Sequence, residues 1–323
     1  MKKISLLLIM CMCVSCFVFV SCSDKPNSDD GKFTVVCSIF PQYDFCRVIS
    51  GGLDGIILLQ KNGVDMHSYE PTSKDIVTVA KADMLVYTGG ESDTWVSGML
   101  SSAENTDIVT VSLFDFATLL PHAEDGHYDH DHDHDHNHEE GEACTEYDEH
   151  VWTSPKNAIK IVQGLCEKMC GANPKHAEQY RENTRKYTQE LMALDAEYEE
   201  LFEEISPTLI IADRFPFLYL THDYNVDYHA AFSGCSSETG ASFEVVKSLI
   251  DEMNENGIGV VFDVDNSDSD VAHRVSESCN ATIYTLYSCQ SVTHRQLEDG
   301  ESYLSFMKTN LSTLREAYKD VNI

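Results

Sequence analysis

Histidine recurs at every second position in YDHDHDHDHNHEEGE (residues 128–142), where the imidazoles alternate with carboxylates. Residues two apart on an extended chain lie about 6.5–7 Å from each other. Two nitrogens that bind one zinc ion, each at about 2.0–2.1 Å, must be much closer. The tract must therefore fold around each ion, and we expect several weak, acid-sensitive sites, with a solvated loop as the alternative. Seven histidines form this accessory metal loop: His122, His127, His130, His132, His134, His136 and His138.

Two further histidines lie outside the tract, in polar segments beside predicted secondary structure. His67 lies in NGVDMHSYEPTSKD, after the apolar run GIILLQ, and His150 lies in YDEHVWTSP, just before a predicted helix. Neither belongs to an apolar stripe, so each is a candidate metal ligand or a surface histidine. Neutral imidazole favours zinc and other borderline metals over calcium or magnesium. Asp148 and Glu149 either orient His150 by hydrogen bonding or are exposed charges.

The elements that would position these residues alternate between short apolar runs and amphipathic stretches. Such alternation is typical of parallel sheets covered by helices, which bind ligands at the carboxyl ends of their strands. Predicted strands span residues 33–40, 55–60, 81–90 and 107–114 in the first half, and 208–213, 226–232, 259–265 and 281–289 in the second.

One long helix is predicted between the two halves, from Pro174 to Ile205. Its apolar positions step by three and four residues and form one stripe, while its other faces are charged. The stripe comprises Tyr187, Leu191, Leu194, Tyr198, Leu201 and Ile205. The predicted fold class is therefore α/β: two lobes of parallel-rich sheet flanked by helices, joined by one long rigid helix.

The N-terminus, MKKISLLLIMCMCVSCFVFVSC, predicts an export signal over residues 1–22, because its apolar run follows basic residues and is short for a membrane span. An uncleaved membrane anchor is the alternative. The segment resembles the lipobox of bacterial lipoproteins, which implies a lipid anchor on Cys22, with Cys16 as a weaker cleavage site. Both interpretations place the rest of the chain outside the cytoplasm, anchored to the bacterial cell membrane.

The formal net charge of −32 excludes nucleic acid as a partner, since nothing in such a chain would displace counterions from phosphates. An acidic surface instead concentrates cations near the protein.

Several sequence blocks resemble, in order and spacing, those of zinc and manganese ABC-importer solute-binding proteins. These blocks are CSIFPQYDFCRVISGG, DMHSYEPTSKDI, KADMLVYTGGESDTWV, DEHVWTSPKNA, IADRFPFLYLTHDYNVDYHAAFSGC and SYLSFMKTNLSTL. The resemblance covers essentially the whole chain after the signal. It implies one divalent metal bound between two α/β lobes, with His67 and His150 as ligands, small lobe motion, and delivery to an ABC transporter membrane permease.

The resemblance is less regular in the C-terminal lobe. The family's third ligand, a histidine or a glutamate, would fall at about Ala212, so the neighbouring Asp213 is the leading candidate; a salt bridge to Arg214 or a helix cap is its alternative role. A carboxylate in place of the third histidine would tolerate Mn²⁺ as well as Zn²⁺. Other candidates are Asp263, Asp265 and Gln290, of which the last replaces a histidine of related sequences, with His222, His229 and His294 as further replacements.

Eight cysteines follow the signal, and none forms a CxxC pair, so a cysteine zinc cluster is not expected. The resemblance implies a disulfide between Cys235 and Cys289, with two buried thiols as the alternative. Cys166 and Cys170 lie one helical turn apart and are expected to remain separate.

The predicted function is the capture of Zn²⁺, or of Mn²⁺, and its delivery to the importer. The chain is not expected to be an enzyme, because it has no HExxH, GxSxG or Walker motif. The alternatives are an adhesin or metal buffer that acts through the His-rich loop, and a secreted metallohydrolase. Predicted boundaries are 1–22 for the signal, 23–32 for a tether, 33–172 for the N-terminal lobe with its loop at 121–147, 173–206 for the linking helix and 207–323 for the C-terminal lobe.

Overall fold

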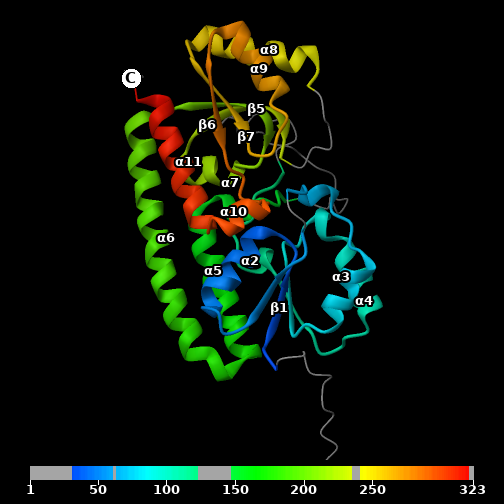
Figure 1. Ribbon diagram of the computed structural model, residues 1–323. Coiled ribbons are helices and arrows are strands. Elements are labelled where there is room, and N and C mark those ends of the chain that lie inside the picture. Colours follow the sequence, from blue (N-terminus) through cyan, green and yellow to red (C-terminus); the bar gives the residue numbers. More distant parts are fainter. Residues whose placement is uncertain (1–30, 61–62, 123–146, 235–240, 320–323) are drawn as a thin grey trace, which may run out of the picture. The chain divides into compact units, whose positions relative to one another are not determined.

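Two four-stranded parallel sheets form the framework of the computed structural model, which describes residues 31–60, 63–122, 147–234 and 241–319 (Figure 1). In the first sheet the order is β2 (Gly55–Leu58), β1 (Thr34–Cys37), β3 (Met84–Tyr87) and β4 (Val109–Ser112). In the second it is β6 (Asp227–Ser233), β5 (Thr208–Phe215), β7 (Val260–Val264) and β8 (Thr282–Leu286). The predicted fold class is confirmed.

Helices follow the strands in sequence and cover the sheets. The first half contains α2 (Phe40–Ser50), α3 (Ser73–Ala80), α4 (Trp95–Ala103) and α5 (Pro155–Ala172). The second half contains α7 (Leu218–Tyr224), α8 (Phe243–Asn256), α9 (Asp270–Cys279), α10 (His294–Glu298) and α11 (Tyr303–Tyr318). Because helices lie against the central strands, β1 is buried from Val35 to Cys37 and reads as a continuous apolar run.

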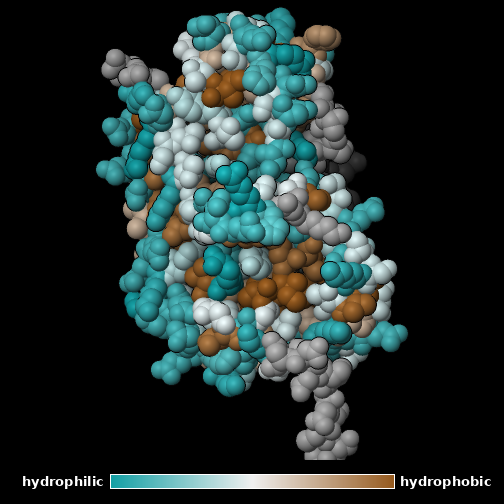
Figure 2. Space-filling view, viewed as in Figure 1, coloured by the Kyte–Doolittle hydropathy of each residue, from teal (hydrophilic) through white to brown (hydrophobic). Residues whose placement is uncertain are grey.

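The long helix α6 (Ala177–Ile205) contacts α2 and α5 of the first half and α7 and α11 of the second (Figure 1). Its predicted stripe is buried from Tyr187 to Leu201, and its other side is the hydrophilic left edge of Figure 2. The α-helix begins three residues after Pro174, because a short 3₁₀ turn, η5 (Pro174–His176), precedes it.

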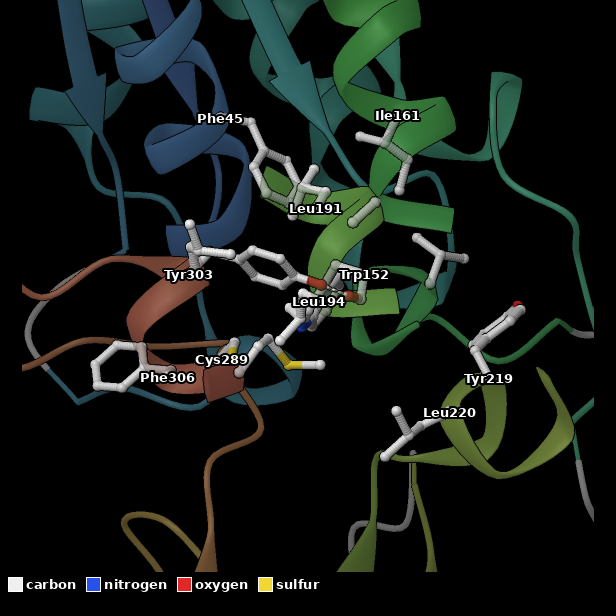
Figure 3. Close-up of a cluster of buried hydrophobic side chains, with 14 of the residues drawn as sticks. Phe45, Trp152, Ile161, Leu191, Leu194, Tyr219, Leu220, Cys289, Tyr303 and Phe306 are labelled. Atoms are coloured by element: carbon white, nitrogen blue, oxygen red, sulfur yellow. Dashed lines mark hydrogen bonds between the residues drawn. The ribbon is translucent and has the colours of Figure 1, made fainter. Parts of the chain in front are cut away.

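One hydrophobic core joins the two halves beside α6 (Figure 3). Trp152 donates its indole N–H to the Ser288 carbonyl oxygen at 2.9 Å, and the Tyr303 hydroxyl donates to the Trp152 carbonyl oxygen at 2.7 Å. Both bonds are buried and join residues more than 130 positions apart. The lobes are therefore tied together where they meet.

Residues Lys32–Ile323 form one compact unit. Within the part of the chain that the structure describes, no helix is both long and apolar enough to cross a membrane. The predicted signal, Cys22 and most of the tether lie outside the described residues.

Candidate metal site

A polar cavity of about 140 Å³ lies where strands of both sheets end. Asp65 and His67 reach it from the segment after β2, and His150 from the residue before the short helix η4 (Val151–Thr153). The second half contributes residues from within β5 and from the segments after β7 and β8: Asp213, Arg214, Asp265 and Gln290. The predicted location at carboxyl strand ends is therefore where the candidate residues meet.

His67 is held by a chain of hydrogen bonds to a buried carboxylate. The Ser92 hydroxyl lies 2.7 Å from His67 Nδ1 and 2.5 Å from Glu149 Oε2, and the Ser92 backbone N–H donates to Glu149 Oε1 at 2.7 Å. The hydroxyl proton is drawn to the carboxylate, so Ser92 accepts from a protonated Nδ1. This leaves the lone pair on His67 Nε2, which is buried and has no hydrogen-bond partner. An unpaired buried acceptor costs about 1–3 kcal/mol, so this nitrogen is suited to a bound ion.

His150 is oriented by its own neighbour in the sequence. Asp148 Oδ1 accepts from the His150 backbone N–H at 2.9 Å and lies 3.1 Å from Nδ1. The carboxylate favours a proton on Nδ1 and leaves Nε2 as the available ligand atom. Asp148 and Glu149 are both 2% exposed, so the alternative of exposed charges is wrong, and each carboxylate serves a different histidine.

The two imidazole rings lie 5.4 Å apart, centroid to centroid, and are tilted by 55°. Two imidazoles that bind one tetrahedral ion through nitrogens at about 2.0–2.1 Å have centroids about 5 Å apart. The spacing of His67 and His150 therefore matches a shared ion without rearrangement of the backbone.

The pKa values of the two histidines are shifted in opposite directions. Burial, followed by the charge of His150, lowers the pKa of His67 from 6.5 to about 4. Burial also opposes the charged form of His150, but the charge and hydrogen bond of Asp148, with Glu149, outweigh it and raise the pKa of His150. A proton in this cavity therefore resides on His150 and not on His67.

The C-terminal carboxylates line the same cavity but accept hydrogen bonds from nearby backbone and side-chain donors. Asp213 Oδ1 accepts from the Arg214 backbone N–H at 2.7 Å, and Oδ2 has only a 3.4 Å bond from Val264 N. Asp265 accepts at both oxygens, from Ser288 N at 2.6 Å and from Asn266 Nδ2 at 2.8 Å. Of these acids, Asp213 has the more available oxygen.

Among the described residues, no three His, Cys, Asp or Glu side chains are grouped so that they could hold a metal ion. The two histidines form a pair, and the acids of the second half line the cavity without converging on them. Burial is the main cause that raises the pKa of Asp265, and the nearby charge of Asp213 contributes. The arrangement is thus a preformed pair of imidazoles facing carboxylates that already accept hydrogen bonds.

Strand β5 continues two residues beyond its predicted end, and its pairing with β6 shifts register between Ile211 and Arg214. Side chains alternate along a strand, so two neighbours face opposite sides of β5: Ala212 packs in the core under α8 and α9, while Asp213 lines the cavity. The suggested salt bridge between Asp213 and Arg214 is wrong, because the Arg214 guanidinium pairs elsewhere.

Arg214 forms an ion pair across the cavity. Its Nη1 lies 2.6 Å from Asp65 Oδ2, while Asp65 Oδ1 accepts from the His67 backbone N–H at 2.8 Å. A residue of the second sheet thus braces the turn that carries His67. Sequence reasoning missed this link, since the two partners are 149 positions apart.

Two glycines permit close approaches around the histidines. A Cβ atom on Gly90 would lie 2.1 Å from Glu149 Oε1, and one on Gly234 would lie 2.9 Å from Asp148 Oδ2 and 3.2 Å from His150 Nδ1. Side chains at these positions would displace the carboxylates that orient the two imidazoles. Neither glycine, nor Ser92, was identified from the sequence.

Several candidate ligands lie away from the cavity. Asp263 accepts from the Ser269 hydroxyl, and three histidines pair with acids on their own surfaces: His222 with Asp223, His229 with Glu252, and His294 with Glu298. None of these residues lines the cavity, so the prediction that they are ligands of this site is wrong. Strand alternation explains His229, which faces α8 instead of the cavity.

The His-rich loop is described only at its ends. Pro121 and Tyr147 form an antiparallel bridge, and Asp148 N donates to the Leu120 carbonyl oxygen at 3.1 Å. His122 is partly buried and does not line the cavity, while the other six histidines of the tract lie outside the described residues. The loop thus leaves and rejoins the described chain next to Asp148.

The predicted Cys235–Cys289 disulfide involves Cys235, which lies outside the described residues. Cys289 is a free, fully buried thiol, with its Sγ atom 3.7 Å from the Tyr287 carbonyl oxygen. Figure 3 shows Cys289 among Leu194, Tyr303 and Phe306 in the shared core. Cys289 is thus a buried core thiol, while its predicted pairing with Cys235 depends on a residue outside the described part of the chain.

Two lobes of parallel sheet, with a polar cavity where their strands end, define the chain as a two-lobed solute-binding protein. The family described as ZnuA, zinc-uptake complex component A, periplasmic, matches residues 35–317, and the chain belongs to this family.

The chain is 30% identical to the zinc-binding lipoprotein AdcA of Streptococcus pneumoniae over 98% of its own length, but spans 61% of that relative. It is 27% identical to the high-affinity zinc uptake system protein ZnuA of Bacillus subtilis, covering 94% of this chain and 95% of that protein. The crystal structure of the Zn(II)-bound ZnuA-like domain of pneumococcal AdcA has a TM-score of 0.72 and 26% identity, over 89% of this chain and 99% of that domain.

Proposed function

We propose that this chain captures Zn²⁺ between its two lobes and delivers it to the membrane permease of an ABC importer. The ion would bind Nε2 of His67 and of His150, with Asp213 as the third ligand. Mn²⁺ is the alternative cargo, because a carboxylate ligand suits it better than a third imidazole would. The zinc-binding names of the relatives support this assignment.

The observation that carries the proposal is the arrangement of the imidazole pair. Both Nδ1 atoms are engaged with a hydroxyl or a carboxylate, and the ring centroids are 5.4 Å apart. Such outer hydrogen bonds fix the tautomer of a metal-binding histidine and raise its basicity. These bonds leave the Nε2 lone pairs of both histidines available in one cavity, which is the arrangement that a shared metal ion requires.

Isothermal titration with Zn²⁺ tests the proposal on two variants. One carries His67→Ala and His150→Ala, and the other lacks residues 122–142. We expect the deletion variant to keep one tight site and to lose the weak sites of the tract. The double substitution should lose the tight site and keep the weak ones. If the double variant keeps the tightest site, the proposal is wrong; if the deletion loses it, the His-rich loop is the principal site and the adhesin or buffer function is favoured.

We further propose that residues 1–22 are a lipoprotein signal and that Cys22 carries the lipid that anchors the protein outside the cytoplasm. Its sequence context and the lipoprotein name of the pneumococcal relative support this location. Metabolic labelling with a fatty acid should mark the wild type and not Cys22→Ala, which should appear in the soluble fraction. Equal labelling of both proteins would contradict the assignment.

A further inference from the structure

Two thiols lie side by side in a groove between α5 and α6, and no residue of this groove lines the histidine cavity. Cys166 and Cys170 are one helical turn apart on α5, with 5% and 7% of their surfaces exposed. Their Sγ atoms are 3.9 Å apart. The groove has a volume of about 810 Å³ and is walled on the opposite side by α6.

The spacing of the two sulfur atoms fits chelation better than a disulfide. Two thiolates bound to one tetrahedral ion at about 2.3 Å have sulfur atoms about 3.8 Å apart. A disulfide instead requires Cβ atoms about 3.5–4.5 Å apart, whereas residues one helical turn apart have Cβ atoms about 5–6 Å apart. Oxidation of the pair would therefore distort α5, and coordination of an ion would not.

The opposite wall of the groove offers polar atoms that have no partner. The hydroxyl oxygens of Thr184 and Thr188 are buried and form no hydrogen bond, although the side chains are only 7% and 8% exposed. Such groups are costly unless a ligand or its water molecules satisfy them. Both line the same groove as the two thiols, from the facing helix.

We propose that Cys166 and Cys170 form a second metal site, which binds one thiophilic divalent ion such as Cd²⁺ or Zn²⁺. The two thiolates hold the ion, and water molecules in the groove complete its coordination. Binding displaces the two thiol protons to solvent, so affinity rises with pH.

Cadmium titration of the reduced full chain tests the site, followed by the ultraviolet charge-transfer absorption of cadmium thiolate. Ions bound to the His-rich loop do not contribute to this absorption, because imidazole and carboxylate ligands form no cadmium–thiolate bond. We expect one Cd²⁺ per chain in the wild type, and at least tenfold weaker binding in Cys166→Ser/Cys170→Ser. Cys279→Ser, a part-buried single thiol, is the matched control and should behave as wild type. His67→Ala/His150→Ala should also retain the band, which separates this site from the proposed function.

Alkylation provides a second measurement on the wild type, which needs no variant to fold. Cd²⁺ should slow the modification of Cys166 and Cys170 by iodoacetamide, as read by peptide mass spectrometry, and leave Cys279 unaffected. The proposal is overturned if the serine double variant keeps the wild-type charge-transfer band. It is equally overturned if Cd²⁺ gives neither a band nor protection when both thiols are shown to be reduced.

Discussion

The two halves of the cavity are built differently. In the N-terminal half, His67 and His150 have their Nδ1 atoms bound and their rings at a spacing that matches one shared ion. In the C-terminal half, the carboxylates of Asp213 and Asp265 accept hydrogen bonds from backbone and side-chain donors of the protein. We infer that the imidazole half sets how tightly an ion is held, and that the carboxylate half adjusts to the ion and influences which one is held.

The largest effect is expected from a change in the prepared half. Asp148→Asn removes the charge that orients His150, and the loss of such an outer partner weakens metal binding by about 10–100-fold. Titration of Zn²⁺ measures the change. Glu298→Gln is the matched control, because it removes the carboxylate beside the exposed His294. Unchanged Zn²⁺ affinity in Asp148→Asn would mean that the Asp148 carboxylate does not orient His150 for metal binding.

Acid should expose the difference between the two histidines. The pKa of His150 is raised above its ordinary value of 6.5 and that of His67 is lowered to about 4, so between about pH 6.5 and pH 5 the metal-free site carries a proton on His150 and none on His67. The proton competes with the ion, and affinity should fall by about tenfold per pH unit in this window. Zn²⁺ competition titrations against a chelator across the window measure the slope. A slope of two protons would show that both rings titrate together.

A smaller and ion-dependent effect is expected at Asp213. Its Oδ2 has only a 3.4 Å bond, whereas both oxygens of Asp265 are held by bonds of 2.8 Å or less. Asp213→Asn should therefore weaken Mn²⁺ by about tenfold and Zn²⁺ less, since manganese prefers carboxylate oxygen. Asp265→Asn should chiefly lower the midpoint of thermal unfolding. Should Asp265→Asn alter ion preference and Asp213→Asn not, the two acids would have exchanged roles.

The smallest effect is expected from the link between the halves. The ion pair of Arg214 and Asp65 is partly exposed, with Arg214 36% exposed, and such pairs contribute about 0.2–1 kcal/mol. Arg214→Ala should speed metal dissociation roughly two- to fivefold by loosening the turn of His67. Stopped-flow transfer to a chelator measures it, with Arg315→Ala, which breaks the exposed pair with Glu197, as the control. No difference from that control would limit Arg214 to an ordinary surface role.

The sequence predicts the fold well because its signals are local. Apolar runs and the stripe of α6 depend on residues a few positions apart, and the structure places strands and the long helix where they indicate. His67 and His150 each lie in a polar block just outside a predicted element, and the resemblance of those blocks to the importer family assigns both as ligands.

The parts of the site that the sequence did not reveal depend on distant partners. Ser92 bridges His67 and Glu149, and the last two residues are far apart in the chain. Asp213 Oδ2 has its only 3.4 Å bond from Val264 N, which is 51 positions away in the chain. His229 was a candidate because of its residue type, but strand pairing turns it toward Glu252.

A crystal structure of the zinc-loaded protein, with an anomalous difference map at the zinc edge, tests the central inference most directly. We predict one strong peak within bonding distance of Nε2 of both His67 and His150, with the Nδ1 contacts to Ser92 and Asp148 unchanged. A strongest peak bound through Nδ1 of either ring, or located away from both histidines, would contradict the claim that the N-terminal half is the prepared half of the site.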